Sequence, residues 1–161
     1  MPVSADQYRQ IGRACAGAVS VITVLDQASS AVVALTVSSL VTLSFDPPLV
    51  MFAIQKNASS FPSIIASKTF GVSVLGHSQM EAAQRFAARD PHKTAGVQFD
   101  RGQVLNVPLV PDSLARIECL TQQIVTSGDH SIIVGQVESA VTQDGQPLLY
   151  FARQYGSFRP L

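Results

Sequence analysis

Short apolar stretches rich in β-branched residues recur along this 161-residue chain, and several alternate strictly with polar residues. Stretches of this kind, bounded by Gly, Pro, Asp and Ser, predict β-strands. Because turn residues separate most of them, we expect hairpins and antiparallel pairing. The expected strands cover residues 19–25, 31–36, 40–45, 49–54, 69–75, 115–126, 131–141 and 148–151.

Three short helices are also expected, one before the first strand and two between later strands. Ser4 and Gln7 have the spacing of a capping box, and apolar residues at helical spacing follow them. Pro62 suits the first turn of a second helix that ends near Ser67, with the preceding serines as candidate caps. A second capping box at residues 78–81 opens a third helix that runs to about Arg89.

Residues 90–111 mix Pro, Gly, Asp, His and Lys without a regular period, which predicts an irregular segment able to cover a site. Strands outnumber helices, and the chain contains neither internal repeats nor a low-complexity linker. The pattern therefore predicts one domain over residues 1–161, mainly β with short helices. A mainly antiparallel barrel fits it better than a doubly wound parallel sheet.

Composition adds an expectation about assembly. Apolar residues make up 47% of the chain and charged residues only 14%, with 11 basic and 11 acidic residues giving a formal net charge of zero. A chain with no net charge lacks the excess of basic residues that binding to nucleic acid or to an anionic membrane requires. The low charge is also insufficient to cover a small monomer, so we expect a homodimer with a large apolar interface.

Several function classes lack their usual motifs. The chain has no dinucleotide-binding glycine motif, no P-loop, no nucleophile elbow and no zinc-protease motif. Cys15 and Cys119 belong to no metal-binding spacing and are expected to be buried, so neither a metal site nor a protein nucleophile is predicted. With no signal-like start and no apolar run of about 18 residues, the expected location is cytoplasmic, without membrane association.

Small polar side chains gather at the ends of two apolar strands, in the segment from Leu35 to Ser60. The first cluster can offer hydroxyls and amides to the edge of a polar ring, and the second, near a helix start, can bind a phosphate. Each alone is equally well explained as an ordinary strand end or helix entry. Together they suit a flavin, and they consist of Thr36, Ser38 and Ser39 and of Asn57, Ser59 and Ser60.

The chain resembles the small NAD(P)H-dependent flavin reductases, the reductase components of two-component flavin monooxygenases. The match covers nearly the whole length and depends on the order of several weak segments. These are residues 17–23, 35–39, 45–50, 70–75, Gln79, 85–87, Gly128-Asp129-His130, 147–151 and Tyr155. The resemblance implies an FMN-binding split β-barrel, a homodimer with flavin near the subunit interface, and a partner monooxygenase that receives reduced flavin.

The resemblance also implies roles for particular residues. His130 and Tyr155 are the candidate nicotinamide contacts, and Phe86 is expected to help close the flavin pocket. The isoalloxazine edge should be lined by Thr36, Val37, Ser38 and Ser39. The ribityl chain and phosphate should lie near Gln55, Asn57, Ser59 and Ser60. From the residues themselves, Lys56 is the one lysine expected in that phosphate site.

The residues leave several alternatives open. FMN or FAD, and NADH or NADPH, fit equally well. One rival is a non-catalytic flavin-binding module or redox sensor on the same barrel, which would consume no NAD(P)H. The other is an enzyme resembling pyridoxamine phosphate oxidases, but such a site needs several basic residues for the substrate phosphate.

Overall fold

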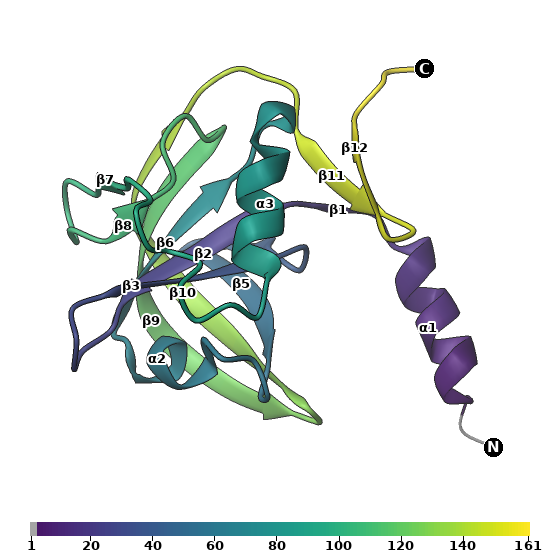
Figure 1. Cartoon of the computed structure of the whole chain (residues 1–161), viewed down its shortest axis with the longest axis horizontal. Helices are drawn as coiled ribbons and strands as arrows, with labels where there is room; N and C mark the ends of the chain where they lie inside the picture. Colours follow the sequence, from purple (N-terminus) through teal and green to yellow (C-terminus); the bar gives the residue numbers. More distant parts are fainter. Residues whose placement is uncertain (1–2) are drawn as a thin grey trace.

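Strands dominate the computed structural model, which describes residues 3–161 (Figure 1). Its helices are α1 (Ala5–Ala14), α2 (Phe61–Ala66), the 3₁₀ turn η1 (His77–Gln79) and α3 (Met80–Ala87). The strands are β1 (Gly17–Ala18), β2 (Ser20–Leu25), β3 (Val32–Val37), β4 (Val41–Phe45), β5 (Pro48–Gln55), β6 (Thr69–Val74), β7 (Asp100–Arg101), β8 (Pro108–Leu109), β9 (Ala115–Ser127), β10 (His130–Thr142), β11 (Leu148–Phe151) and β12 (Gln154–Ser157).

The largest sheet of the described chain has seven strands in the order β3-β2-β6-β9-β10-β5-β4, and all its pairs are antiparallel. Two further sheets are β1-β11-β12 and β7-β8. This confirms the prediction of a mainly β, antiparallel chain with short helices. The sequence pattern located eight of the strands to within a few residues and missed β1, β7, β8 and β12, each of which has four residues or fewer.

The seven-stranded sheet is strongly curved around its core. Phe52 on β5 and Phe70 on β6 have ring centroids 5.4 Å apart, although β9 and β10 lie between their strands in the sheet order. Because neighbouring strands are about 4.8 Å apart, three such steps in a flat sheet would separate the rings by about 14 Å. Gly135 on β10 makes room for this contact, since a Cβ there would overlap the Phe70 ring.

A hydrogen bond also joins the segment after one edge strand of this sheet to a strand near the opposite edge. Ser39, just after the edge strand β3, accepts a hydrogen bond from the Ala53 amide at 3.0 Å through Oγ, which also lies 3.3 Å from the Ala53 carbonyl oxygen. Ala53 belongs to β5, the strand next to the opposite edge. The curvature therefore brings the polar segment after β3 against β5.

The N-terminal helix confirms its capping box. Gln7 N donates to Ser4 Oγ at 3.2 Å, and Ser4 N donates to Gln7 Oε1 at 2.8 Å. None of the residues of α1 is buried. Figure 1 shows α1 and the sheet β1-β11-β12 standing to one side of the main sheet.

The second predicted capping box was wrong. The chain enters α3 through the 3₁₀ turn η1, so Ser78 lies inside the turn and is not its cap. One half of such a contact forms two residues earlier, where the Gly76 amide donates to Gln79 Oε1 at 2.9 Å. The helix itself covers β3 and buries Ala83 and Phe86.

Asp26 joins the β2-β3 turn to α2. Its carboxylate accepts from the Ala28 and Ser29 amides, from the Ser29 hydroxyl and, at 2.8 Å, from the Ser63 hydroxyl. These hydrogen bonds favour the ionised form, so they lower the pKa of Asp26 to about 2, with the Ser63 bond the largest cause. The carboxylate thus stays charged at ordinary pH and keeps the hairpin end against the helix.

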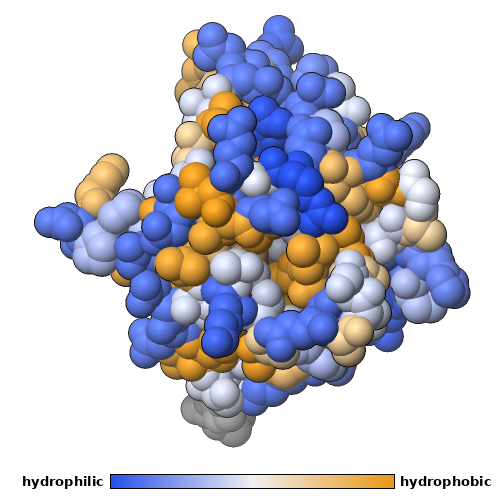
Figure 2. All heavy atoms as spheres, turned by 90° about the vertical axis from the view of Figure 1, so that its left-hand side faces the viewer, coloured by the Kyte–Doolittle hydropathy of each residue, from blue (hydrophilic) through white to orange (hydrophobic). Residues whose placement is uncertain are grey.

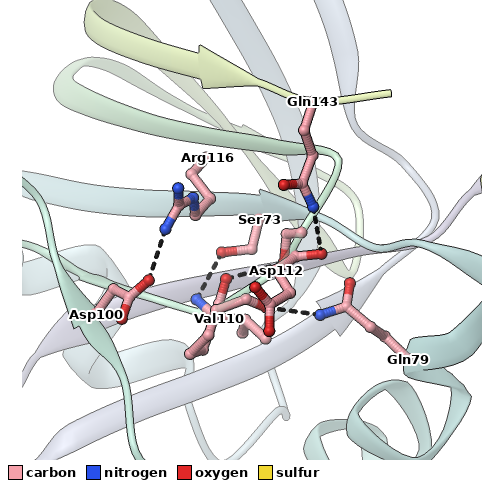
Figure 3. Close-up of polar contacts among 9 residues, drawn as sticks. Ser73, Gln79, Asp100, Val110, Asp112, Arg116 and Gln143 are labelled. Atoms are coloured by element: carbon pink, nitrogen blue, oxygen red, sulfur yellow. Dashed lines mark hydrogen bonds and ion pairs between the residues drawn. The ribbon is translucent and has the colours of Figure 1, made fainter. Parts of the chain in front are cut away.

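The irregular segment before β9 is held by side chains from three elements (Figure 3). Arg116 binds Asp100 at 2.6 Å, and the Val110 amide donates to Ser73 Oγ at 2.9 Å. Gln79 and Gln143 donate to the carbonyls of Pro111 and Asp112. This network keeps residues 100–112 in place against β6 and β9.

Two burial expectations differ from the structure. Cys119 is buried as expected, but Cys15 is exposed because it follows α1 outside the main core. The strand β4 was expected to be half-buried, yet Val41, Leu43 and Phe45 are 44%, 46% and 99% exposed. Within residues 3–161 no helix has the length and apolar character needed to cross a membrane.

Candidate flavin site

An open cavity of about 610 Å³ lies at the C-terminal end of β3. It is formed where the chain after β3, the end of β5, the entry to α2 and the segment after α3 come together with the start of β10. The lining residues are Leu35, Thr36, Val37, Ser38, Ser39, Ala53, Ile54, Gln55, Asn57, Ala58, Ser59, Ser60, Ala87, Ala88, Arg89, Lys93 and His130. None of these described lining residues is acidic.

The cavity unites most of the residues nominated from the sequence. Both polar clusters and His130 line it, together with Gln55 and Val37. Tyr155 lies instead in an adjacent cavity of about 150 Å³, which shares Thr36, Val37, Ser38 and Ala87 with the first. The structure therefore places the two candidate nicotinamide contacts, His130 and Tyr155, in neighbouring cavities.

Phe86 is one of two nominated residues that line neither cavity, and Lys56 is the other. Its side chain is only 1% exposed and its ring lies 5.8 Å from that of Phe99 in the core beneath α3. Helical periodicity places Phe86 on the same face of α3 as Ala83, and that face packs against the sheet. Phe86 therefore does not line the cavity in this structure, and its neighbour Ala87 lines it instead, so a role of Phe86 in closing the pocket stays a prediction.

The hydroxyls of the first cluster have mainly structural contacts. Thr36 Oγ1 donates to the Ala83 carbonyl at 2.8 Å, which fastens the end of β3 to α3. Ser39 Oγ accepts a hydrogen bond from the Ala53 amide and lies near the Ala53 carbonyl, which fastens the residues after β3 to β5. Ser38 is exposed at the cavity and is the hydroxyl of this cluster best placed to meet a ligand.

Ser60 provides the clearest indication of a ligand. It is 3% exposed, precedes α2 and lines the cavity, but its side chain makes no capping hydrogen bond. Its Oγ is buried without a hydrogen-bond partner among the described residues, as is that of Ser20 in β2, but of the two only Ser60 lines the cavity. Leaving a buried hydroxyl unpaired costs about 1–3 kcal/mol, and a polar ligand atom in the cavity would remove that cost. The donor set beside it, with Asn57 and Ser59, fits a phosphate ester.

The cations of the site differ from the sequence expectation. Lys56 was nominated beside the phosphate, but its Nζ donates to the Gly128 carbonyl at 2.7 Å and it does not line the cavity. Arg89 and Lys93 line the cavity instead. Lys93 is 8% exposed, and burial lowers the pKa of its ammonium, with Asp90 opposing the shift. The only sequence signal was the position of Lys93 in the segment expected to cover a site, whereas Arg89 was expected at the end of the third helix.

His130 begins β10 opposite Gln55 of β5, after a turn in which Gly128 has a φ of +58°. Its Nδ1 lies 2.7 Å from Asp129 Oδ1, and this contact lowers the pKa of the Asp129 carboxyl. Lys56 also fixes the turn, since its amide donates to the Asp129 carbonyl at 2.9 Å. With Nδ1 held by Asp129, Nε2 is the ring nitrogen left for a ligand.

The described residues contain no cluster of three or more His, Cys, Asp or Glu that could hold a metal ion. The site is therefore defined by its neutral donors, two cations and a histidine around an open cavity on an antiparallel sheet. Neutral donors and cations around an open cavity are features that suit a phosphorylated organic ligand. The fold and sequence of the chain then specify the family.

The chain belongs to the flavin reductase like domain family, whose model matches residues 11–159. Its sequence is 34% identical to the reductase subunit HsaB of a flavin-dependent monooxygenase from Rhodococcus jostii, over 93% of this chain and 75% of that protein. It is 33% identical to NADH:riboflavin 5'-phosphate oxidoreductase from Streptomyces pristinaespiralis, over 98% of this chain and 90% of that protein.

Solved structures agree with this family. BorF, the flavin reductase component of a bacterial two-component tryptophan halogenase, matches with a TM-score of 0.85 and 30% identity, covering 98% of this chain and 100% of that one. The NADH:FAD oxidoreductase SgcE6 of Streptomyces globisporus, in complex with NAD and FAD fragments, matches with a TM-score of 0.87 and 28% identity, covering 99% of this chain and 98% of that one.

Proposed function

We propose that this protein is an NAD(P)H-dependent flavin reductase that uses FMN or FAD and supplies reduced flavin to a partner flavin-dependent monooxygenase. The family match and the names of the relatives support this activity. The observation that carries the proposal on this chain is the unpaired, buried hydroxyl of Ser60 in a cavity lined by two cations and no acidic residue. A flavin phosphate provides the negative charge and the oxygen atoms that such a cavity requires.

In this proposal the flavin occupies the 610 Å³ cavity. The isoalloxazine edge lies at residues 36–39 and the ribityl chain near Gln55. The phosphate lies near Asn57, Ser59, Ser60, Arg89 and Lys93. The Ser60 hydroxyl, which has no partner in the protein, then donates a hydrogen bond to a phosphate oxygen. The two cations balance a phosphate charge of about −2.

A bound flavin supplies the redox chemistry by accepting a hydride, and the protein supplies binding and orientation. Thr36 and Ser39 fix the cavity wall through their hydrogen bonds to α3 and β5, so less ordering has to accompany binding. Asp129 orients the His130 ring and leaves Nε2 for the nicotinamide. No protein nucleophile takes part.

The activity is tested by following NADH absorbance with and without added FMN, FAD or riboflavin. A reductase consumes NADH at a rate that rises with free flavin. A non-catalytic flavin module binds flavin and consumes no NADH. Oxidation of an amine phosphate by the flavin-loaded protein, without NADH turnover, would instead support the oxidase alternative.

Replacing His130 by alanine should raise the KM for NADH about tenfold, the factor expected when one contact of about 1.4 kcal/mol is lost. Flavin affinity should change less than about twofold, because the cavity keeps its hydroxyls and both cations. Steady-state kinetics and flavin titration measure both quantities. His77→Ala is the matched control, because His77 is exposed and lines neither cavity. Equal loss of flavin and NADH binding would assign His130 to the flavin.

We also propose that the curved sheet forms a split barrel and that the protein is a homodimer. The contact between Phe52 and Phe70 across the sheet supports closure. The exposed apolar row of β4 and the unburied helix α1, on which Tyr8 is 68% and Ile11 54% exposed, support the dimer. Figure 2 shows apolar residues gathered among polar ones on the face at the left of Figure 1, the side away from α1, as expected from the low charge content.

A further inference from the structure

The segment after α3 forms one wall of the cavity although it contains no helix or strand. Residues 88–97 are turns and bends, and most of them are exposed. Within this segment Lys93 is the buried side chain, and Ala88, Arg89 and Lys93 line the cavity. An exposed segment without ladder hydrogen bonds opens easily unless other contacts hold it. The contacts that hold it are therefore relevant to ligand binding.

Two basic side chains hold this segment by reaching in opposite directions. Arg85, in the last turn of α3, donates from Nε to the Lys93 carbonyl at 2.7 Å and from its guanidinium to the Ala95 carbonyl at 2.6 Å. Lys93 reaches back, and its Nζ donates to the carbonyls of Phe86 at 2.8 Å and Ala88 at 3.2 Å. Arg85 thus binds backbone carbonyls at and near Lys93, and Lys93 binds backbone carbonyls just after Arg85.

A third contact anchors the segment to the sheet. Thr94 Oγ1 donates to the Val32 carbonyl, at the start of β3, at 2.8 Å. The same strand contributes Leu35, Thr36 and Val37 to the cavity. The wall made by residues 88–93 is therefore fixed both to α3 and to the strand opposite it.

Capping of the α3 C-terminus explains only part of this arrangement. A cation near the last carbonyls of a helix is favourable, and Lys93 satisfies that role at Phe86. Arg85, however, donates to carbonyls of the segment itself, beyond the helix end. Two such bonds from one guanidinium specify the path of residues 93–95 and so the position of Lys93.

We propose that Arg85 is a positioning residue for flavin binding, acting through a reciprocal clasp with Lys93 that holds residues 88–93 as a wall of the cavity. Arg85 does not line the cavity itself. Its loss therefore affects flavin only through the position and order of this wall. The inference rests on the proposed placement of flavin in this cavity.

The experiment compares Arg85→Gln with wild type and with Arg116→Gln, which removes a paired arginine from the network around residues 100–112. Arg85→Gln should raise the FMN dissociation constant about tenfold, whereas Arg116→Gln should change it less than about twofold. Hydrogen exchange of residues 88–97 should accelerate in Arg85→Gln, while kcat at saturating FMN and NADH stays within about twofold of wild type. Arg85→Lys keeps the positive charge but replaces the guanidinium fork by a single ammonium, so it should give an intermediate shift of about threefold. This variant allows the test if the glutamine variant does not fold.

Faster exchange in residues 88–97 with an unchanged FMN dissociation constant would overturn the clasp as a positioning device and leave it as a helix cap. A fall in kcat without a change in affinity would overturn it too. Failure of FMN to protect residues 35–39 and 57–60 from exchange in wild type would instead contradict the placement of flavin. The two failures are thus distinguishable.

Discussion

Replacing Arg89 by glutamine and Lys93 by methionine together should reduce the preference for FMN over riboflavin about 100-fold. A phosphate ester carries a charge of about −2 at pH 7, and each charge-assisted hydrogen bond to it contributes about 1.5–3 kcal/mol. Since Arg89 is exposed, solvent screening reduces its share. The pair together then contributes about 2.7 kcal/mol, which corresponds to about 100-fold in the ratio of dissociation constants.

The ratio is the useful measurement because riboflavin lacks the phosphate. Loss of the Lys93 contacts to Phe86 and Ala88 loosens the cavity wall for both ligands and cancels in the ratio. Fluorescence titration of FMN and riboflavin gives both dissociation constants. Lys56→Met is the control, because this exposed lysine lies outside the cavity and should leave the ratio unchanged. An unchanged ratio in the double variant would place the phosphate elsewhere.

Most of the strands were predictable because their signals are local. The β2-β3 hairpin follows from two apolar runs around a polar turn, and its register pairs Ser20 with Val37 through Leu25 with Val32. Proline at the start of α2 and the capping box of α1 are also local signals, and both helices form there. The short strands β1 and β12 carry too few residues to show a period, so they could not be predicted.

The polar part of the site was predictable for a similar reason. The strands β3 and β5 are close in sequence and Ser39 joins them directly, so the two clusters that follow these strands share one cavity. Burial of Ser60 without a partner was not predictable, because the same residue type before a helix usually caps it. A serine before a helix that is buried and makes no capping hydrogen bond is also the observation that suggests a ligand.

The cations required the three-dimensional structure. Lys56 is adjacent to the second cluster in sequence, but the hairpin turn at Gly128 takes its ammonium away from the cavity. Arg89 and Lys93 come from a segment with no period, which Arg85 and Thr94 fold back over β3. Sequence proximity therefore nominated a lysine that does not line the cavity, since long-range hydrogen bonds decide which charge reaches it.

Phe45→Asp should convert the proposed homodimer to monomer at micromolar concentration. Phe45 is 99% exposed on the edge strand β4, and Val41 and Leu43 on the same strand are also exposed. Apolar and polar residues alternate at positions 41–45, which predicted that one face of this strand is buried. Within a single chain that face is exposed, and a second copy packed on β4 would bury it. Burying one phenylalanine contributes about 1.5–3 kcal/mol, and a two-fold interface counts it twice. Its loss should therefore raise the dimer dissociation constant at least about 150-fold.

Sedimentation equilibrium at about 1–50 μM, a range that brackets the dissociation constants of moderately tight complexes, measures this change. Phe45→Leu is the matched control, because it keeps an apolar side chain at the same position and should remain dimeric. Far-UV circular dichroism of the aspartate variant should match wild type, since the Phe45 side chain makes almost no contact within its own chain. Wild type sedimenting as a monomer would contradict the dimer itself. A dimeric Phe45→Asp variant would move the interface away from β4, leaving α1 as the surface that a second copy covers.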